Sequence, residues 1–355
     1  MKKFDIFLLM SVVILTFFGL FMIYDASSFV AFRDFGDKYH YLKDQLIWIV
    51  LGFITLTVFS YLDYRRLYLL AFPILLIALV LLILVFIPGI GITLMGAHRW
   101  INLGFTVLQP AEFVKLALAI YLAAWFSNKE KGRLPAFLLL MGLVLGLVML
   151  EPDMGTTAVI LAEALAIYFL SGANIFYLSI LVPLIGFLGY LLIKISPYRA
   201  KRLESFLNIG PSLESSSYHV KQILIALGAG GLTGVGLGNS LQKYAYLPES
   251  TTDSIFAIIA EELGFVGVVI LILFFIFVFY RCFRIAVNAK DNFGKLLAGG
   301  IATFLAVQTI INLASQTALI PLTGIPLPFI SYGGSSLIID LAAIGIILNI
   351  SKQKL

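Results

Sequence analysis

Long apolar runs decide what this chain can fold into. Runs of about 17–25 residues are long enough to cross a bilayer as helices. Only 12% of the residues are charged and 61% are hydrophobic, whereas soluble proteins are nearer a quarter charged and half apolar. The sequence therefore predicts an all-α, polytopic membrane protein with ten transmembrane helices, at about 5–25, 45–62, 67–87, 108–126, 135–150, 154–170, 174–194, 255–280, 297–319 and 327–349.

The rest of the composition excludes several other classes of protein. A single cysteine, Cys282, excludes a disulfide framework and a multi-thiolate metal site, and the three histidines are too scattered for a zinc motif. The sequence contains no phosphate-binding P-loop and no G-x-G-x-x-G after a strand. It also lacks the clustered basic and aromatic face of single-strand binders, so we expect no nucleic-acid partner. The first apolar segment has no cleavage site and is read as a retained helix.

Lysine and arginine in the short loops set the orientation. If the N-terminus is cytoplasmic, the inner side collects thirteen basic residues and the short outer loops collect only Arg33, Lys38, Lys43 and Arg99. We therefore expect a multi-pass membrane protein with both termini in the cytoplasm, and the family resemblance given below implies that the membrane is the bacterial cytoplasmic membrane. The domain prediction is one transmembrane domain over residues 1–355, with a long extracytoplasmic loop at about 195–254 between spans seven and eight. This orientation brings four polar clusters to the outer face.

The acidic cluster before the eighth span is the strongest candidate site. Glu249 and Asp253 lie in the sequence YLPESTTDSIF, where a polar connection ends and an apolar helix begins. One interpretation makes Asp253 the N-cap of that helix, because a side-chain oxygen can satisfy orphan backbone N–H groups. The other makes it a catalytic carboxylate at the membrane surface.

A second cluster, HRWINLGFTVLQPAEFVK, opens the fourth span. Arg99 is placed where a guanidinium can grip phosphate. Gln109 precedes a proline suited to the first helical position. Glu112 and Lys115 share one helix face inside the bilayer, where ionisable groups are functional or pair to pack helices.

Other polar positions carry weaker signals. Asp153 belongs to the turn EPDMGTT, where two carboxylates either hold a cation or basic side chain or are simply solvated. Asp25 is expected at the end of the first span. Glu163 and Asp340 are expected to bridge helices.

Two stretches near the outer face complete the pattern. Arg199 and Arg202 are basic residues that could hold a pyrophosphate or anionic lipid, or anchor the chain at the interface. The glycine-rich segment 218–240 is too broken for a span and predicts a re-entrant or interfacial segment whose backbone lines a cavity. Three prolines prevent regular helix before Phe329, and such a broken entry to a span commonly borders a substrate cavity, here beside Ser331 and Tyr332.

These motifs together resemble the SEDS family (shape, elongation, division and sporulation), which contains RodA, FtsW and SpoVE. The resemblance rests on HRWINLG, QPAEFVK, EPDMGTT, RLESFLN, ALGAGGLTGVGLGNSLQK, YLPESTTDSIFAIIAEELGF and PLPFISYGGSSL, in order over nearly the whole chain, and is slightly closer to the FtsW and SpoVE branch. Thr251 and Ser254 depart from the family's usual HTDFIF pattern.

The resemblance implies a ten-span peptidoglycan glycosyltransferase that polymerises lipid II outside the cytoplasmic membrane, with a class B penicillin-binding protein as partner. It implies that Asp253 is the essential carboxylate. The implied supporting residues are Arg99, Gln109, Glu112, Lys115, Asp153 and Arg202.

In the mechanism that we expect, Asp253 takes the proton of the acceptor hydroxyl. Basic residues from the clusters above stabilise the departing pyrophosphate, together with Mg²⁺ or Mn²⁺, which diphosphate chemistry suggests although the sequence has no ligand motif. Two alternatives remain open. One is a lipid II flippase with a path through Lys115, Glu163 and Asp340, and the other is a non-catalytic scaffold of the cell-wall machinery.

Overall fold

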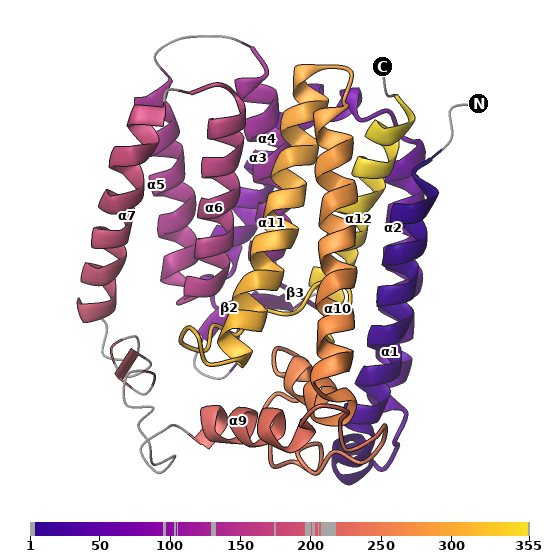
Figure 1. The fold of residues 1–355 in the computed structure, drawn as a ribbon. Helices are drawn as coiled ribbons and strands as arrows, with labels where there is room; N and C mark the ends of the chain where they lie inside the picture. Colours follow the sequence, from indigo (N-terminus) through magenta and orange to yellow (C-terminus); the bar gives the residue numbers. More distant parts are fainter. Residues whose placement is uncertain are drawn as a thin grey trace.

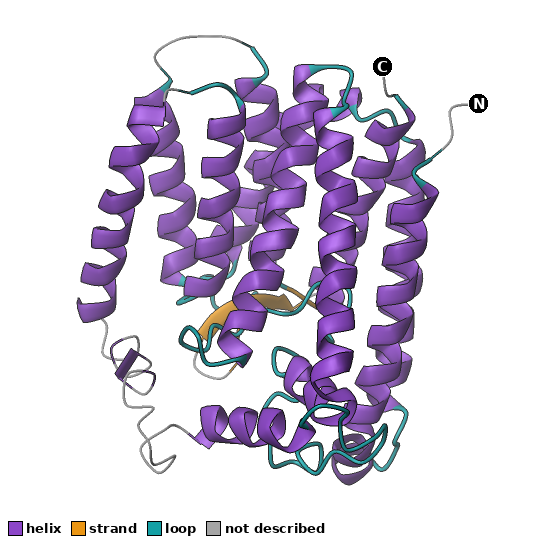
Figure 2. Ribbon diagram, viewed as in Figure 1, coloured by secondary structure: helices purple, strands orange, loops and turns teal. Residues whose placement is uncertain are grey.

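The structure is a computed structural model that describes residues 4–94, 97–102, 104, 106–128, 133–173, 175–195, 200, 203–204, 206 and 218–353. It is a mostly helical bundle with both chain ends at one end of the bundle (Figures 1 and 2). The long helices are α1 (Ile6–Phe35), α2 (His40–Tyr61), α3 (Arg65–Leu84), α4 (Pro110–Phe126), α5 (Leu134–Leu150), α6 (Met154–Leu170), α7 (Ile175–Ile195), α10 (Ile255–Val287), α11 (Asn292–Gln316) and α12 (Gly334–Lys352).

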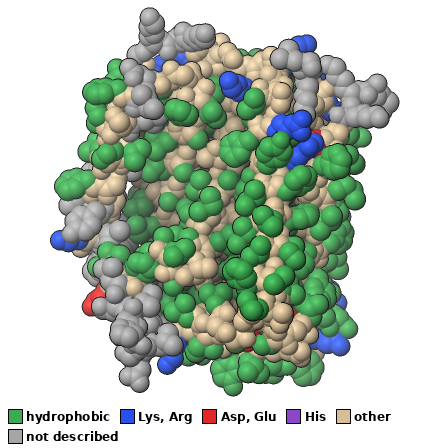
Figure 3. All heavy atoms as spheres, viewed as in Figure 1, with side chains coloured by type: hydrophobic (Ala, Val, Ile, Leu, Met, Phe, Trp, Pro, Cys, Tyr) green, Lys and Arg blue, Asp and Glu red, His purple; other side chains and the backbone are tan. Residues whose placement is uncertain are grey.

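Each predicted span overlaps one of these helices. Within the described residues, α1, α2, α3, α10, α11 and α12 are long and apolar enough to cross a membrane, and α5 and α6 are shorter apolar helices. Hydrophobic side chains cover the visible face of the bundle, as expected for a surface that meets lipid (Figure 3). The prediction of a polytopic helical membrane protein is confirmed at this level.

Several predicted span ends differ from the helix ends by five residues or more, and two of these differences have a clear local cause. Helix α1 continues ten residues beyond Asp25 and ends at Phe35, where Gly36 adopts a left-handed conformation (φ 71°). Helix α12 begins at Gly334 instead of residue 327, because the prolines before it leave the chain from 321 to 327 without regular structure.

The end of the bundle away from the termini carries the non-helical structure. A three-stranded antiparallel sheet in the order β1-β2-β3 connects α3 to α4, and its strands are β1 (Gly91–Leu94), β2 (Ala97–Asn102) and β3 (Val107–Leu108). This sheet is a departure from the all-α prediction. The short helix α9 (Tyr218–Gly230) lies across the same end of the bundle (Figure 1).

A kink at Gly264 divides helix α10. Gly264 has φ 67° and ψ −170°, so Ile255–Leu263 forms a separate short helix before the long apolar remainder. The glycine-rich segment pairs with this kink through its backbone. Val235 N–H donates to Glu261 O (3.0 Å), and Phe265 N–H donates to Gly231 O (3.0 Å). The prediction that this segment lines a cavity is wrong for residues 228–240, none of which lines the cavity described below; the backbone of residues 230–236 packs against α10 instead.

Gly234 is the tightest contact of this pairing. It has φ 80°, and a Cβ atom on it would lie 2.0 Å from Glu262 O. A left-handed conformation and a backbone clash both oppose any side chain there.

We expect Gly234→Ala to lower the free energy of unfolding by about 2 kcal/mol or more, because the neighbouring backbone must move. The matched control is Gly228→Ala, where a Cβ meets nothing within 4 Å, so its melting temperature should stay equal or rise slightly. Thermal unfolding in detergent measures both. Equal melting temperatures for the two variants would contradict the packing described.

Candidate functional site

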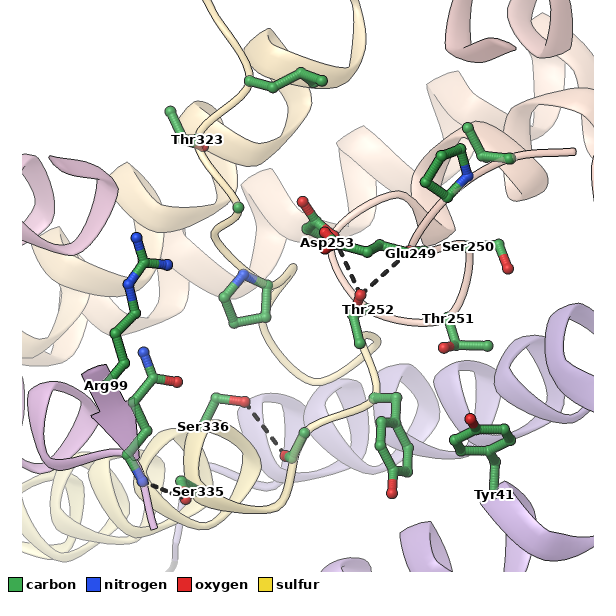
Figure 4. Close-up of a pocket in the computed structure, with 18 of the residues that line it drawn as sticks. Tyr41, Arg99, Glu249, Ser250, Thr251, Thr252, Asp253, Thr323, Ser335 and Ser336 are labelled. Carbon is green, nitrogen blue, oxygen red and sulfur yellow. Dashed lines mark hydrogen bonds between the residues drawn. The ribbon is translucent and has the colours of Figure 1, made fainter. Parts of the chain in front are cut away.

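A cavity of about 1500 Å³ opens at the end of the bundle that carries the sheet and α9. Segments far apart in the sequence form its walls: α1 and α2, the sheet, the starts of α4 and α12, and the loops before α10 and after α11. Its polar lining includes Arg33, Asp44, Arg99, Gln109, His219, Glu249, Ser250, Thr251, Thr252, Asp253, Thr323, Tyr332, Ser335 and Ser336. Figure 4 shows Asp253 and Glu249 on one side of this space and Arg99 on another.

Asp253 lies at this cavity with only 6% of its surface exposed. The Thr252 hydroxyl donates a hydrogen bond to its Oδ1 atom over 3.1 Å. The N-cap of α10 is Ser254, and no side chain of the cap accepts a hydrogen bond from the helix. The N-cap interpretation of Asp253 is therefore wrong, and its carboxyl lines the cavity.

Burial raises the pKa of Asp253 well above its ordinary value, because an anion is poorly solvated there. The neighbouring Glu249 carboxyl raises it further by hydrogen bonding and charge repulsion, while the hydrogen bond from Thr252 opposes the shift. A carboxylate with a raised pKa is a stronger base than an exposed one. Burial also raises the pKa of Tyr332 to about 12, so its hydroxyl stays neutral and can donate.

A tight turn holds Asp253 in place. Glu249 adopts φ 52°, and its carbonyl accepts hydrogen bonds from Thr252 N–H (3.1 Å) and Ser254 N–H (3.2 Å). Tyr332 N–H donates to Thr251 O over 2.9 Å. This hydrogen bond joins the proline-rich loop before α12 (residues 321–333) to the acidic turn before α10 (residues 249–254).

Arg99 is fixed by the turn between α5 and α6. Its Nε donates to Glu151 O over 2.9 Å, and its Nη2 donates to Pro152 O over 2.5 Å. Both acceptors are backbone carbonyls, so the positive charge of Arg99 is not neutralised by them. Gln109 is placed by its own backbone N–H, which donates to Ser335 Oγ over 3.2 Å.

Five of the predicted site residues lie together at the cavity: Asp253, Glu249, Arg99, Gln109 and Tyr332. Arg199 and Arg202 lie outside the described residues.

Four other predicted residues do not line the cavity. Glu112 and Lys115 form a buried ion pair (2.7 Å) inside the bundle. Asp153 is the N-cap of α6 and accepts a hydrogen bond from Thr156 N–H (3.0 Å). Ser331 Oγ accepts one from Leu327 N–H (2.8 Å) within its own loop.

The sequence analysis missed the contribution of α2. Tyr41, Asp44 and Trp48 lie in its first turns and line the cavity beside Tyr332, whose ring is 5.2 Å from that of Tyr41. In the sequence, the only indication of their role was the spacing of three and four between these polar and aromatic residues at the start of a span. The same pattern is ordinary for residues that anchor a helix at the membrane interface.

A buried charge cluster around Lys243 joins the connection that leads to the acidic turn to α1 and α10. Lys243 Nζ lies 2.9 Å from Asp25 Oδ1 on α1 and 3.1 Å from Glu262 Oε1 on α10. The carboxylate of Glu261 accepts hydrogen bonds from Ser240 Oγ and from Leu241 N–H (3.1 Å). These contacts join α1, α10 and the connection that leads to Asp253.

Comparison with known proteins shows the family of this chain. Residues 6–355 match the family described as "Cell cycle protein", which comprises FtsW, RodA and SpoVE. The chain belongs to this family.

Its relatives match over nearly their whole lengths. It is 43% identical to "Probable peptidoglycan glycosyltransferase FtsW" of Trichlorobacter lovleyi, over 99% of this chain and 94% of that protein. It is 40% identical to "Stage V sporulation protein E" of Bacillus subtilis, over 98% and 97%. Both agree with the resemblance seen in the sequence.

Two solved structures share the fold of this family member. One is described as "Structural coordination of polymerization and crosslinking by a peptidoglycan synthase complex" (TM-score 0.80, 28% identity, 99% of this chain and 98% of that chain). The other is the rod shape determining protein RodA of Thermus thermophilus (TM-score 0.74, 28% identity, 99% and 98%).

Lys243→Met should destabilise the protein by about 3 kcal/mol or more, because it leaves two carboxylates of the cluster without their cation. The control Lys38→Met removes an exposed lysine from the same end of the bundle and should leave the melting temperature unchanged. Thermal unfolding in detergent compares the two variants. A melting temperature for Lys243→Met equal to that of the parent protein would show that this cluster does not hold the end of the bundle together.

Proposed function

We propose that this protein is a peptidoglycan glycosyltransferase that polymerises lipid II at the outer face of the cytoplasmic membrane. The observation that carries the proposal is the buried Asp253 carboxyl, with its raised pKa, in a cavity that Arg99 also lines. Its relatives' names as glycosyltransferases support the reaction class.

The cavity has the chemistry that a lipid-linked sugar needs. Its polar wall is continuous with apolar side chains of two helices, Val30 of α1 and Ile47 and Leu51 of α2. A polyprenyl chain can follow apolar helix surfaces while the sugar and diphosphate occupy the polar part. Substrate and site would then meet at the membrane surface.

In the proposed step, the 4-hydroxyl oxygen of one sugar bonds to C1 of another. The bond from C1 to the diphosphate oxygen breaks, and undecaprenyl diphosphate leaves with the electron pair. Asp253 accepts the proton of the attacking hydroxyl and later releases it to water. General-base catalysis of this kind contributes about 10²–10⁴-fold to a rate.

Arg99 is suited to the leaving group. Its two hydrogen bonds to carbonyls hold the guanidinium in one orientation before substrate arrives. A pre-oriented cation stabilises charge that develops on the diphosphate without reorganising during the reaction. Gln109 and Tyr332 supply further hydrogen-bonding groups in the same cavity.

A divalent ion would bind at this site together with the substrate diphosphate. Among the described residues, no group of three His, Cys, Asp or Glu side chains could hold a metal ion. Mg²⁺ commonly binds one or two carboxylates plus substrate phosphates. Glu249 would supply such a carboxylate, and Mg²⁺ or Mn²⁺, when bound, would neutralise charge on the diphosphate.

The structure favours catalysis over lipid II transport. A flippase needs a polar path through the middle of the membrane, for which Lys115, Glu163 and Asp340 were the candidates. All three are at most 1% exposed, and none lines the cavity. The polar groups that are accessible gather at one end of the bundle.

The same proposal includes topology and partner. The ten long helices would all span the membrane as a single domain, with both termini cytoplasmic and the connection at about 195–254 outside. A class B penicillin-binding protein would bind this chain to crosslink the product. The solved relative described as coordinating polymerization and crosslinking supports such a pairing.

Asp253→Asn should lower the rate of lipid II polymerisation at least about 100-fold, because the amide cannot accept the proton. The control is Asp63→Asn, which changes a carboxylate at the opposite end of the bundle. Purified protein in detergent, supplied with lipid II, gives the rate from the length and amount of glycan. Polymerisation by Asp253→Asn at the parent rate would contradict the assignment.

Glu249→Gln should move the acid limb of the pH profile of kcat/KM to lower pH. The base works ionised, so the rate rises as pH passes the pKa of Asp253, and Glu249 helps to raise that pKa. Removing the Glu249 charge therefore lowers the pKa of Asp253, and the rate then rises at a lower pH. An acid limb that stays in place, or moves to higher pH, would show that Asp253 is not the titrating base.

A further inference from the structure

Asn312 of α11 joins the two loops that form one wall of the cavity. Its side chain is fully buried. The Nδ2 group donates one hydrogen bond to Asp253 O over 2.9 Å and another to Ile325 O over 2.8 Å. Asp253 ends the acidic turn, whereas Ile325 belongs to the proline-rich loop about 70 residues later in the chain.

The chemistry of this position is specific. A primary amide nitrogen carries two hydrogens, and here each is directed to a different carbonyl. An aspartate of the same shape has no donor to offer, and a leucine of similar size has none either. Leaving a buried carbonyl unpaired costs about 1–3 kcal/mol of stability. Replacing Asn312 by a side chain without a donor would leave the carbonyls of Asp253 and Ile325 without this partner.

A second amide lies one helical turn away on the same face. Gln308 Nε2 donates to Pro326 O over 3.1 Å, and Gln308 Oε1 accepts from Lys115 Nζ over 2.5 Å. Lys115 in turn pairs with Glu112. The buried ion pair of α4 is thus connected through Gln308 to the residue that follows Ile325.

We propose that Asn312 is a positioning residue, which sets the distance of the Asp253 carboxyl from the opposite wall of the cavity by fastening the acidic turn to the proline-rich loop. The proposal rests on the glycosyltransferase function above. Asn312 does not line the cavity, so it acts on the reaction only through the backbone of Asp253.

The expected size of the effect follows from geometry. A displacement of about 1 Å in a catalytic group can reduce a rate about 100-fold. Arg99, Gln109 and α2 would also bind substrate, and the two hydrogen bonds of Asn312 go to neither of these residues nor to α2. Loss of its two hydrogen bonds should therefore reduce kcat strongly and change KM little.

The experiment compares Asn312→Asp and Asn312→Leu with the control Thr309→Val. Thr309 is a buried neighbour on α11 whose hydroxyl, among the described residues, donates to Leu305 O of its own helix. The steady-state constants are measured with lipid II per mole of folded protein. Both Asn312 variants should lose 10- to 100-fold in kcat with KM changed less than threefold, while Thr309→Val keeps both constants.

Hydrogen exchange of the same proteins tests the inference without relying on activity. The amides of Thr252, Ser254 and Tyr332 bond within the fastened loops and should exchange at least tenfold faster in both Asn312 variants than in Thr309→Val. Unchanged exchange with unchanged kcat would overturn the positioning role. If the parent protein makes no glycan, the glycosyltransferase proposal fails, and the exchange rates alone decide whether Asn312 fastens the two loops.

Discussion

Desolvation of one carboxyl group, that of Asp253, is the constraint on which the rest of the site depends. A carboxylate in water is a weak base, and removing it from water raises its pKa at the expense of stability. The protein tolerates this because the surrounding backbone is closely fastened: Glu249 closes the turn, Tyr332 N–H holds Thr251, and Asn312 holds the carbonyl of Asp253 itself. The packing of the rest of the bundle compensates for the cost of the buried Asp253 carboxyl and of the positive φ at Glu249.

The two ends of the bundle differ in how they are built. At the end with both termini, α1 and α11 begin at simple N-caps, Asp5 and Asp291, whose side chains accept hydrogen bonds from the backbone of the first turn. At the other end, Asp153 caps α6 in the same way, but the start of α10 is held by a kink, a glycine-rich segment and a charge cluster around Lys243. This asymmetry fits a protein that spans the membrane with one catalytic face.

Hydropathy was sufficient to predict the helices, because a bilayer fixes their length and composition. Hydropathy could not predict which charged residues form ion pairs with residues far away in the sequence. Asp25 looked like the end of a span, but Lys243, more than 200 residues away, allows the helix to continue past it. For Lys115 the sequence left open a role in the site or a pair with Glu112, and the structure shows the buried pair, which Gln308 extends. Asn312 was invisible, since one amide in an apolar run gives no signal of the two carbonyls it meets.

The most direct test of the central claim is the side of the membrane to which the Asp253 turn is exposed. The native Cys282 is buried, so Thr251→Cys provides one accessible thiol at the cavity, and Lys290→Cys provides one at the opposite end. A membrane-impermeant maleimide added to intact spheroplasts should label Thr251→Cys and leave Lys290→Cys unlabelled, and lipid II should slow the labelling. Labelling of Lys290→Cys alone would place Asp253 on the cytoplasmic side and contradict catalysis at the outer face.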